Sequence, residues 1–503
     1  MMKIYAVLFF LFVCASMPDV SSCSLFAQTE QTTKEKELLD ARNNAAKHSP
    51  ELASALVDLG FYYADVRRYH LAEKVLTEAL NIYRNFAQNE PEVYLTDVAR
   101  VLNGLGTVHS NMNQYFRSLA EMGFMMALDI RRKLANDQSE VHLADVAKTL
   151  TNLGNAHAKM NRYSLAEKEL TEALDIFRTL AENQPDIYLP NVAMTLNNLG
   201  GTHANMCRYS LAEKELTEAL DIRSKLAEDQ PDIYLPDVAS TLYNLGGMHL
   251  KMNRYVFAEK KLVEALVILR KLAENQQDTY LPDVANTLIA LGIVHQYLNQ
   301  FLVAEAELME ALGIYRELFK DQPEIYISNV AMILQNLGSL HLKMSHLLCA
   351  MEELTLAQDI YVKLADQSEV YWSNVADALS ALGILYCCMD QPHFSESKIM
   401  VALDIYRKLA NDQPEIYLPK VAMTLNIQGF CLQYIKQYSL AERAYMEALD
   451  IYRNLANDQP EIYSQDVNET INSLMNLREA GYSSPSDVLR PENAKSNVET
   501  DEN

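Results

Sequence analysis

The sequence predicts an all-α protein, specifically a right-handed α-solenoid of stacked antiparallel helix pairs. The first observation behind this prediction is a recurring phrase: "LAENQPDIYLPNVAMTLNNLGGTH" begins at Leu180, and its near copy "LAEDQPDIYLPDVASTLYNLGGMH" begins at Leu226. The second observation is that each copy carries two apolar stripes with helical spacing. Repetition at a fixed period of about 20–50 residues is typical of solenoids, in which each unit buries its apolar face against the next.

Each repeat is expected to contain two helices. In "NVAMTLNNLGGTHANM" one face of a helix gathers Val192, Leu196, Leu199 and His203. In "SLAEKELTEALDIRSKLAED" one face gathers Ala212, Leu216, Ala219, Leu220 and Leu226. Lys214 and Glu218 lie outside this face and are spaced to pair with each other. "QPDIYLP" should end the second helix and connect it to the next repeat, because proline cannot continue a helix interior. The sequence leaves open where the next helix starts between Pro185 and Pro190.

A column of glycines runs through the middle of the first helices. A mid-helix glycine costs about 1 kcal/mol relative to alanine, so its recurrence predicts the close approach of a partner helix. Alanines that recur in the second helix, such as Ala212 and Ala219, would supply the facing small surface. The glycine column consists of Gly60, Gly106, Gly154, Gly200, Gly246, Gly292, Gly338, Gly383 and Gly429.

The pattern resembles a known family. Leu199, Gly200 and His203, followed by Ala212, Leu216 and Ala219, match the signature of the tetratricopeptide repeat (TPR) in order, and "VAMTLNNLG" looks like the kinesin-light-chain subtype. The resemblance implies a TPR-like superhelix whose first helices line a concave groove that holds a partner's extended backbone. The unit here is longer than the usual one of about 34 residues. We expect the extra length in both the helices and the connector.

The chain divides into five predicted segments. They are a signal peptide (1–27), a linker (28–49), about nine TPR-like repeats (50–463), a C-terminal capping helix (464–480) and a disordered tail (481–503). The polar stretch 29–47 within the linker could also form a fraying helix. The tail is polar and contains two prolines, which is typical of a segment unable to form a packed core.

The N-terminus predicts export. Lys3 precedes an apolar run from Ile4 to Val13 that is too short to span a bilayer, which takes about 20 residues. "VSSC" resembles a bacterial lipobox, so one alternative is cleavage before Cys23 with lipid attached to that cysteine, giving a membrane-anchored lipoprotein. The other is ordinary cleavage after Ala27. We therefore expect a location in the periplasm, in the cell envelope or outside the cell. The cysteines beyond Cys23 show no disulfide framework.

The composition narrows the function. The chain has 67 acidic and 43 basic residues, a net charge of −24, and no basic cluster, which argues against nucleic acid as a partner. No cofactor, metal-binding or catalytic motif occurs, so we predict that the protein is not an enzyme. The repeated histidines, such as His203, are interpreted as buried structural rings. The acids of "AEKELTEALD" are interpreted as a solvated helix face. A glycan-acting or other enzyme and a self-assembling structural array remain the alternatives.

The favoured function is an exported scaffold that binds an unidentified protein or peptide through its concave surface. Amides are suited to this role because they both donate to and accept from a peptide backbone. The alternative for the asparagines is hydrogen bonding between repeats. The candidate groove residues are Asn103, Asn111, Asn152, Lys159, Asn197, Asn198, Asn205, Asn244, Lys251, Asn336 and Lys343.

Overall fold

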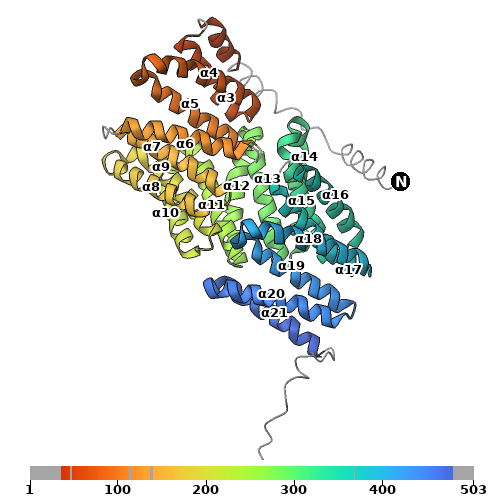
Figure 1. Cartoon of the computed structure of the whole chain (residues 1–503). Coiled ribbons are helices and arrows are strands. Elements are labelled where there is room, and N and C mark those ends of the chain that lie inside the picture. Colours follow the sequence, from red (N-terminus) through yellow and green to blue (C-terminus); the bar gives the residue numbers. More distant parts are fainter. Residues whose placement is uncertain (1–34, 46–47, 113–115, 136–139, 367–368, 480–503) are drawn as a thin grey trace, which may run out of the picture. The chain divides into compact units, whose positions relative to one another are not determined.

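The structure is a computed structural model that describes residues 35–45, 48–112, 116–135, 140–366 and 369–479. Within these ranges the chain is built of helices, and from Pro50 to Asp321 and again from Leu347 to Glu479 each helix packs against the next one along the chain (Figure 1). The expected all-α solenoid of helix pairs is therefore confirmed. The chain forms two compact units, Met1–Ile333 and Leu334–Asn503, and the boundary between them lies within α15.

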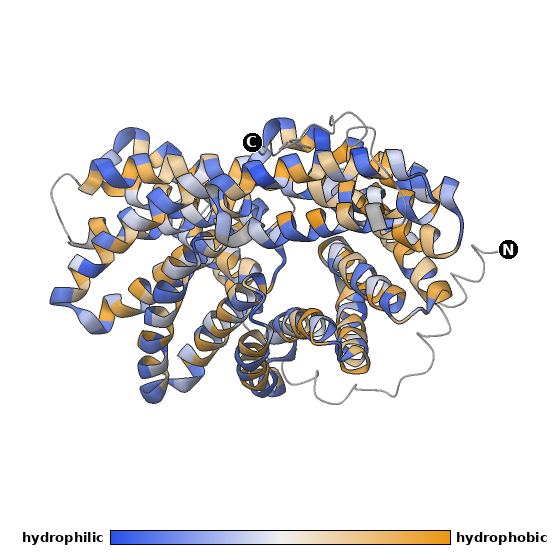
Figure 2. Ribbon diagram, turned by 90° about the horizontal axis from the view of Figure 1, so that it is seen from below, coloured by the Kyte–Doolittle hydropathy of each residue, from blue (hydrophilic) through white to orange (hydrophobic). Residues whose placement is uncertain are grey.

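The first unit contains paired helices that alternate between the two types expected from the sequence. Its helices are α3 (Pro50–Asp65), α4 (Tyr69–Asn89), α5 (Pro91–Asn111), α6 (Arg117–Leu134), α7 (Glu140–Lys159), α8 (Tyr163–Asn183), α9 (Pro185–Asn205), α10 (Tyr209–Asp229), α11 (Pro231–Lys251), α12 (Tyr255–Asn275), α13 (Gln277–Tyr297) and α14 (Phe301–Asp321). Figure 2 shows hydrophobic and hydrophilic residues alternating along single helices, as expected where one face of each helix is buried.

The second unit continues the same pattern. After α15 (Pro323–Lys343) come α16 (Leu347–Ala365), the short 3₁₀ helix η3 (Glu369–Tyr371), α17 (Trp372–Cys388), α18 (Pro392–Asp412), α19 (Pro414–Tyr434), α20 (Tyr438–Asp458) and α21 (Pro460–Glu479). None of the helices in the described ranges is long and apolar enough to cross a membrane.

The extra length of the repeat lies in the helices and not in the connector. Both α9 and α10 have 21 residues, and the connector between α8 and α9 is the single residue Gln184. The expectation of a longer connector is therefore wrong. Pro185 begins α9, where a missing N–H leaves no bond unmade. Pro190 lies inside the same helix, so only one of the two prolines acts as a boundary.

The glycine column brings paired helices together, as predicted. A Cβ atom added to Gly200 would lie 2.7 Å from Cγ of Leu216 and 3.3 Å from the carbonyl oxygen of Ala212. Gly154, Gly246 and Gly292 have equivalent contacts with the leucine of their own second helix. Leu216 is fully buried. Glycine thus allows the leucine of α10 to fill the space over α9.

The N-terminal boundary differs from the predicted one. Residues 35–44 lie in the segment expected to be a linker, but they form a helix that packs on the first repeat. Glu35 accepts hydrogen bonds from the Tyr63 hydroxyl at 3.2 Å and from the Arg68 guanidinium at 3.0 Å. Leu38 and Leu39 pack against the apolar core of that repeat, which explains why this polar segment is ordered as a helix.

At the other end, α21 starts four residues before the predicted cap and places Leu477 against Tyr445 of the last pair. The predicted signal peptide, with Cys23, and the predicted tail lie outside the described residues.

Candidate functional site

A polar hollow of about 370 Å³ lies in the first unit. Four first helices, α5, α7, α9 and α11, supply almost all of its lining, and Phe124 of α6 completes it. The lining residues are Thr107, Ser110, Asn111, Phe124, Asn152, Asn155, Ala158, Lys159, Asn197, Asn198, Gly201, Thr202, Asn205 and Asn244. First helices therefore converge on a common surface, as the resemblance implied.

The hollow gathers seven of the predicted groove residues: Asn111, Asn152, Lys159, Asn197, Asn198, Asn205 and Asn244. Asn103 and Lys251 are hydrogen-bonded to lining residues without lining the hollow themselves. Asn336 and Lys343 belong to the second unit, so they form no part of this hollow. One predicted set of residues is thus divided between two separate bodies.

Two pairs of asparagines are bonded between repeats. The Asn152 side-chain N–H donates to the Asn103 side-chain oxygen at 3.3 Å, and Asn244 donates to Asn197 at 3.0 Å. Asn197 is also buried, with 6% of its surface exposed. For these four residues the structural alternative raised by the sequence describes the contacts.

Two other side-chain amides in the hollow are free to hydrogen-bond a ligand. In the part of the chain that the structure describes, the side chains of Asn155 and Asn198 make no hydrogen bond, although both are partly exposed. Asn198 neighbours Asn197 in sequence, but a helix turns about 100° between successive residues, so the two amides point in different directions. The hollow therefore presents free donors and acceptors beside two hydrogen-bonded pairs of asparagines.

The lysines of the hollow are held by their neighbours. The Lys159 ammonium group donates to the Asn111 side-chain oxygen at 3.1 Å and to the Ser110 carbonyl oxygen at 3.2 Å. Lys251 donates to Asn205 in the same way. Lys159 is exposed, yet the surrounding helices remove part of its hydration and lower its pKa, and the nearby Arg117 charge adds to that effect. Lys159 thus places one cation in the lining of the hollow, and Lys251 contacts the lining residue Asn205 from outside it.

Two glycines of this region have no packing role. A Cβ atom added to Gly201 or to Gly247 would meet nothing within 4 Å, in contrast to the same addition at Gly200. Sequence analysis missed them, together with Asn155, Thr107 and Ser110. The available signal was the doubled glycine of "NLGG", of which one glycine alone belongs to the packing column. At Gly201 the missing side chain deepens the hollow.

The histidine ladder forms a second set of contacts. His203 lies with Nδ1 2.7 Å from Glu215 of its own repeat and Nε2 3.3 Å from Glu167 of the preceding one. The bond to Glu215 raises the pKa of His203 most, and burial opposes it. His157 and His295 each lie between two carboxylates in the same way. These three are buried rings with both nitrogens engaged, as the structural interpretation requires.

His249 departs from that arrangement. Lys261 occupies the position of Glu215 in this repeat, so the Nδ1 atom of His249 is buried without a hydrogen-bond partner. Burial lowers the pKa of His249, and the Arg254 and Lys261 charges act in the same direction. Within the described ranges, no cluster of three or more His, Cys, Asp or Glu side chains is arranged to hold a metal ion.

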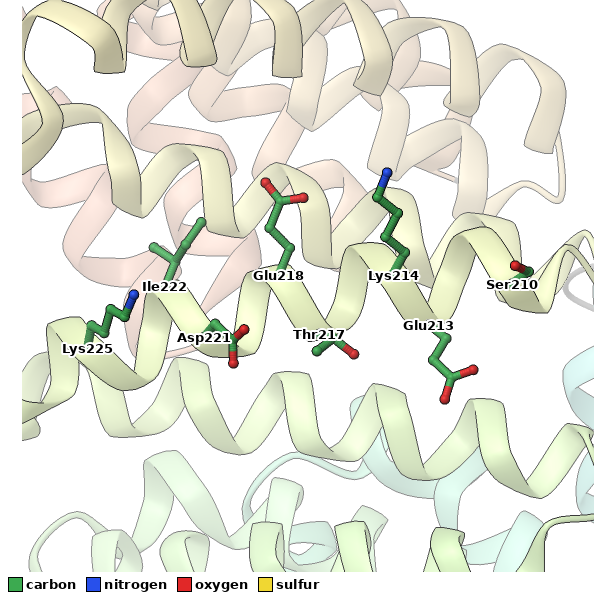
Figure 3. Close-up of a pocket in the computed structure, with 8 residues that line it drawn as sticks. All are labelled: Ser210, Glu213, Lys214, Thr217, Glu218, Asp221, Ile222 and Lys225. Atoms are coloured by element: carbon green, nitrogen blue, oxygen red, sulfur yellow. The ribbon is translucent and has the colours of Figure 1, made fainter.

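A larger hollow, of about 720 Å³, lies along α10, but this helix alone lines it. Figure 3 shows Lys214 and Glu218 pointing to one side of the helix, and Glu213 and Thr217 to the other. Glu218 is paired with Arg178 of the preceding repeat at 2.7 Å, in place of the expected pairing with Lys214. The charged side chains of α10 point in different directions, and no second helix of the described chain faces them across this hollow. We therefore place the candidate site in the smaller hollow.

Comparisons with known proteins agree with the fold. Residues 145–225, within α7 to α10, match the family model described as tetratricopeptide repeat. No curated protein matches the sequence. A solved Rap protein complexed with Competence and Sporulation Factor has a TM-score of 0.50 at 13% identity, covering 82% of this chain and 100% of that one. At this identity the likeness concerns the fold.

Two other solved structures are less similar in shape. BtubC (BKLC) from P. vanneervenii has 22% identity and a TM-score of 0.39, covering 49% of this chain and 90% of that one. The apo quorum sensor NprR from B. thuringiensis has 14% identity and a TM-score of 0.46, covering 76% and 95%. The glycine–leucine contact of the matched residues recurs at Gly246, Gly292 and Gly338, so residues 145–225 match the tetratricopeptide-repeat model and the same helix pairing continues beyond them.

Proposed function

We propose that the protein is a non-enzymatic scaffold that binds an extended segment of a protein or peptide in the hollow lined by α5, α7, α9 and α11. The observation that carries the proposal is the pair of uncommitted amides, Asn155 and Asn198, in a polar hollow. An asparagine side chain offers one acceptor and two donors, which matches the C=O and N–H of a peptide group.

The neighbouring contacts support this function because they fix the surface before a ligand arrives. Asn152 and Asn197 are held by hydrogen bonds to other asparagine side chains, and Lys159 is held by its hydrogen bond to Asn111. A surface whose side chains are already ordered loses less conformational entropy on binding. The lining consists largely of amides and hydroxyls, which suit hydrogen bonding to a backbone.

The function class is tested by selecting a random-peptide library on the purified full-length protein. A scaffold should enrich peptides that remain intact after prolonged incubation. Turnover of a polysaccharide panel that disappears on replacing Glu218 or Asp221 with the corresponding amide would establish the enzyme alternative instead. Light scattering that rises steeply with protein concentration, together with no enriched peptide, would establish the self-assembling array.

We also propose that the scaffold works outside the cytoplasm. Lys3, the apolar run to Val13 and the small residues before Cys23 support export. Mass spectrometry of the mature N-terminus tests this. A lipid-modified Cys23 would give an anchored protein, which Cys23→Ser should release or leave unprocessed. An N-terminus at Gln28 would give an exported protein without the anchor. An intact Met1 in the cytosol would refute export.

A further inference from the structure

Two cysteines of the second unit lie side by side in its interior. Cys387 is in α17 and Cys431 is in α19, and these helices are in direct contact. Their exposed fractions are 3% and 6%, and both pack in one apolar cluster with Ile399. The Cys387 thiol donates a hydrogen bond to the Cys431 sulfur. Both are free thiols in the structure.

The surroundings give the two sulfurs different roles. The hydrogen bond from Cys387 lowers the pKa of Cys431. Burial raises this pKa, and the Ser395 hydroxyl lowers it. The same hydrogen bond and burial raise the pKa of Cys387. Ser395 replaces the alanine that stands at this position in neighbouring repeats, such as Ala441. Because the thiolate is the nucleophile in thiol oxidation, Cys431 is the sulfur prepared to react first.

We propose that Cys387 and Cys431 are a redox modification site, at which a peroxide converts the two thiols into a disulfide that joins α17 to α19. The Cys431 thiolate attacks one oxygen of hydrogen peroxide, the O–O bond breaks, and the leaving hydroxide becomes water with the proton that the Cys431 thiol released on ionising. The Cys387 sulfur then attacks the resulting sulfenic acid at Cys431. The S–O bond breaks, and the leaving hydroxide takes the Cys387 proton. Two thiols and one peroxide thus give one disulfide and two waters.

The exposed Cys388 is a poorer partner for either sulfur. It follows Cys387 directly, and neighbouring Cα atoms are about 3.8 Å apart, below the usual separation of about 4.4–6.8 Å in disulfides. Its side chain is exposed, whereas Cys431 is buried with Cys387. Cys388 therefore serves as an internal control for exposed-thiol chemistry at the same place in the chain.

The test uses the full-length native protein treated with hydrogen peroxide. Remaining thiols are alkylated, and the protein is digested with trypsin and analysed by mass spectrometry without reduction. We expect peptide Leu364–Lys398 joined to peptide Val421–Lys436 within one chain, two hydrogens lighter than their sum. The Cys388→Ser protein should retain this product, and Cys387→Ala should lose it. If Cys387→Ala fails to fold, the wild-type protein still decides by which cysteines escape alkylation.

Three results would overturn the proposal. The first is a link that uses Cys388, because it would survive Cys387→Ala. The second is a link between two chains, shown by a doubled mass on a non-reducing gel. The third is complete oxidation of Cys388 while Cys387 and Cys431 remain fully alkylated after mild denaturation. The last result would mean that the buried pair does not react.

Discussion

His203 joins neighbouring repeats, since its two ring nitrogens face Glu215 of α10 at 2.7 Å and Glu167 of α8 at 3.3 Å. Glu167 also accepts from Arg208 at 2.6 Å, which places a second cation on the same carboxylate. An imidazole that faces two acceptors donates from both nitrogens when it is protonated. The raised pKa of His203 reflects this contact between repeats.

Glu215→Gln should therefore reduce stability in a pH-dependent way. Because the pKa of folded His203 lies above its unfolded value of about 6.5, the stabilisation is fully present below the unfolded pKa and is lost as the pH rises through the folded pKa. We expect the variant to lose about 1–3 kcal/mol near pH 6 and less at pH 9. Urea unfolding at a series of pH values measures this difference, with the exposed Glu228→Gln as the control. A loss independent of pH would contradict the role of His203.

Lys261→Glu should give His249 the carboxylate contact that His203 has with Glu215 and that the fifth repeat lacks. His249 now has a lowered pKa, chiefly because it is buried, and its Nδ1 atom has no partner. A carboxylate at position 261 would supply the acceptor that Glu215 supplies to His203. The lost ion pair with Glu264 is partly exposed and contributes little. An NMR titration should show the pKa of His249 rising in the variant. An unchanged His249 titration would show that the lysine is not what sets it.

Gly200 and Gly201 should respond in opposite ways to substitution. A side chain at Gly200 meets Leu216 and the Ala212 carbonyl, so Gly200→Leu should cost at least about 1–3 kcal/mol through overpacking. Gly201 has open space, so Gly201→Ala should stabilise the helix by up to about 1 kcal/mol. Thermal melting of both variants measures the contrast. Destabilisation by Gly201→Ala would mean that this residue packs against a neighbour after all.

Alanine substitutions at Asn197 and Asn198 should affect the stability of the fold differently, because of these two side chains only that of Asn197 is hydrogen-bonded among the described residues. Asn197→Ala removes a buried amide and leaves the partly buried Asn244 donor without its acceptor, which costs about 1–3 kcal/mol. Asn198→Ala removes no hydrogen bond within the described chain and alanine favours the helix, so its urea midpoint should be no lower than that of the wild type. Equal destabilisation by both variants would show that Asn198 has a structural partner.

The period and the glycine column were sufficient to predict the stacked pairs, because each column glycine faces a large apolar side chain of its own second helix, a leucine in most copies and Phe124, Ile399 or Tyr445 in the others. For residues 35–44 a helix was only the alternative to a linker, because the polar composition hides two leucines that pack on the first repeat. The start of α9 could not be placed from the sequence, because either Pro185 or Pro190 could have marked it. Proline at that depth removes a single backbone bond, and α9 continues through it.

The sequence predicts which equivalent positions of successive first helices contribute to the candidate site. It does not predict which of these side chains hydrogen-bond to each other. Asn197 and Asn198 look equivalent in the sequence, yet one is bonded to Asn244 and the other is uncommitted. Glu215 is one of many acids on the second helices, and no pattern shows that it reaches His203. Such assignments depend on the rotation of each helix and on the spacing between repeats, which the periodicity of one helix does not specify.

The most direct test of the central claim is the dissociation constant of a library-selected peptide for matched variants of the full-length protein. If the hollow binds the peptide backbone, Asn198→Ala should weaken binding about 2–10-fold, the value of one hydrogen bond. Gly201→Ala should weaken peptide binding further, because its methyl group would occupy space in the hollow, although the substitution stabilises the fold. Thr217→Ala on the outer face of α10 should leave the constant unchanged. Wild-type affinity in Asn198→Ala and Gly201→Ala, with loss in Thr217→Ala, would contradict the account.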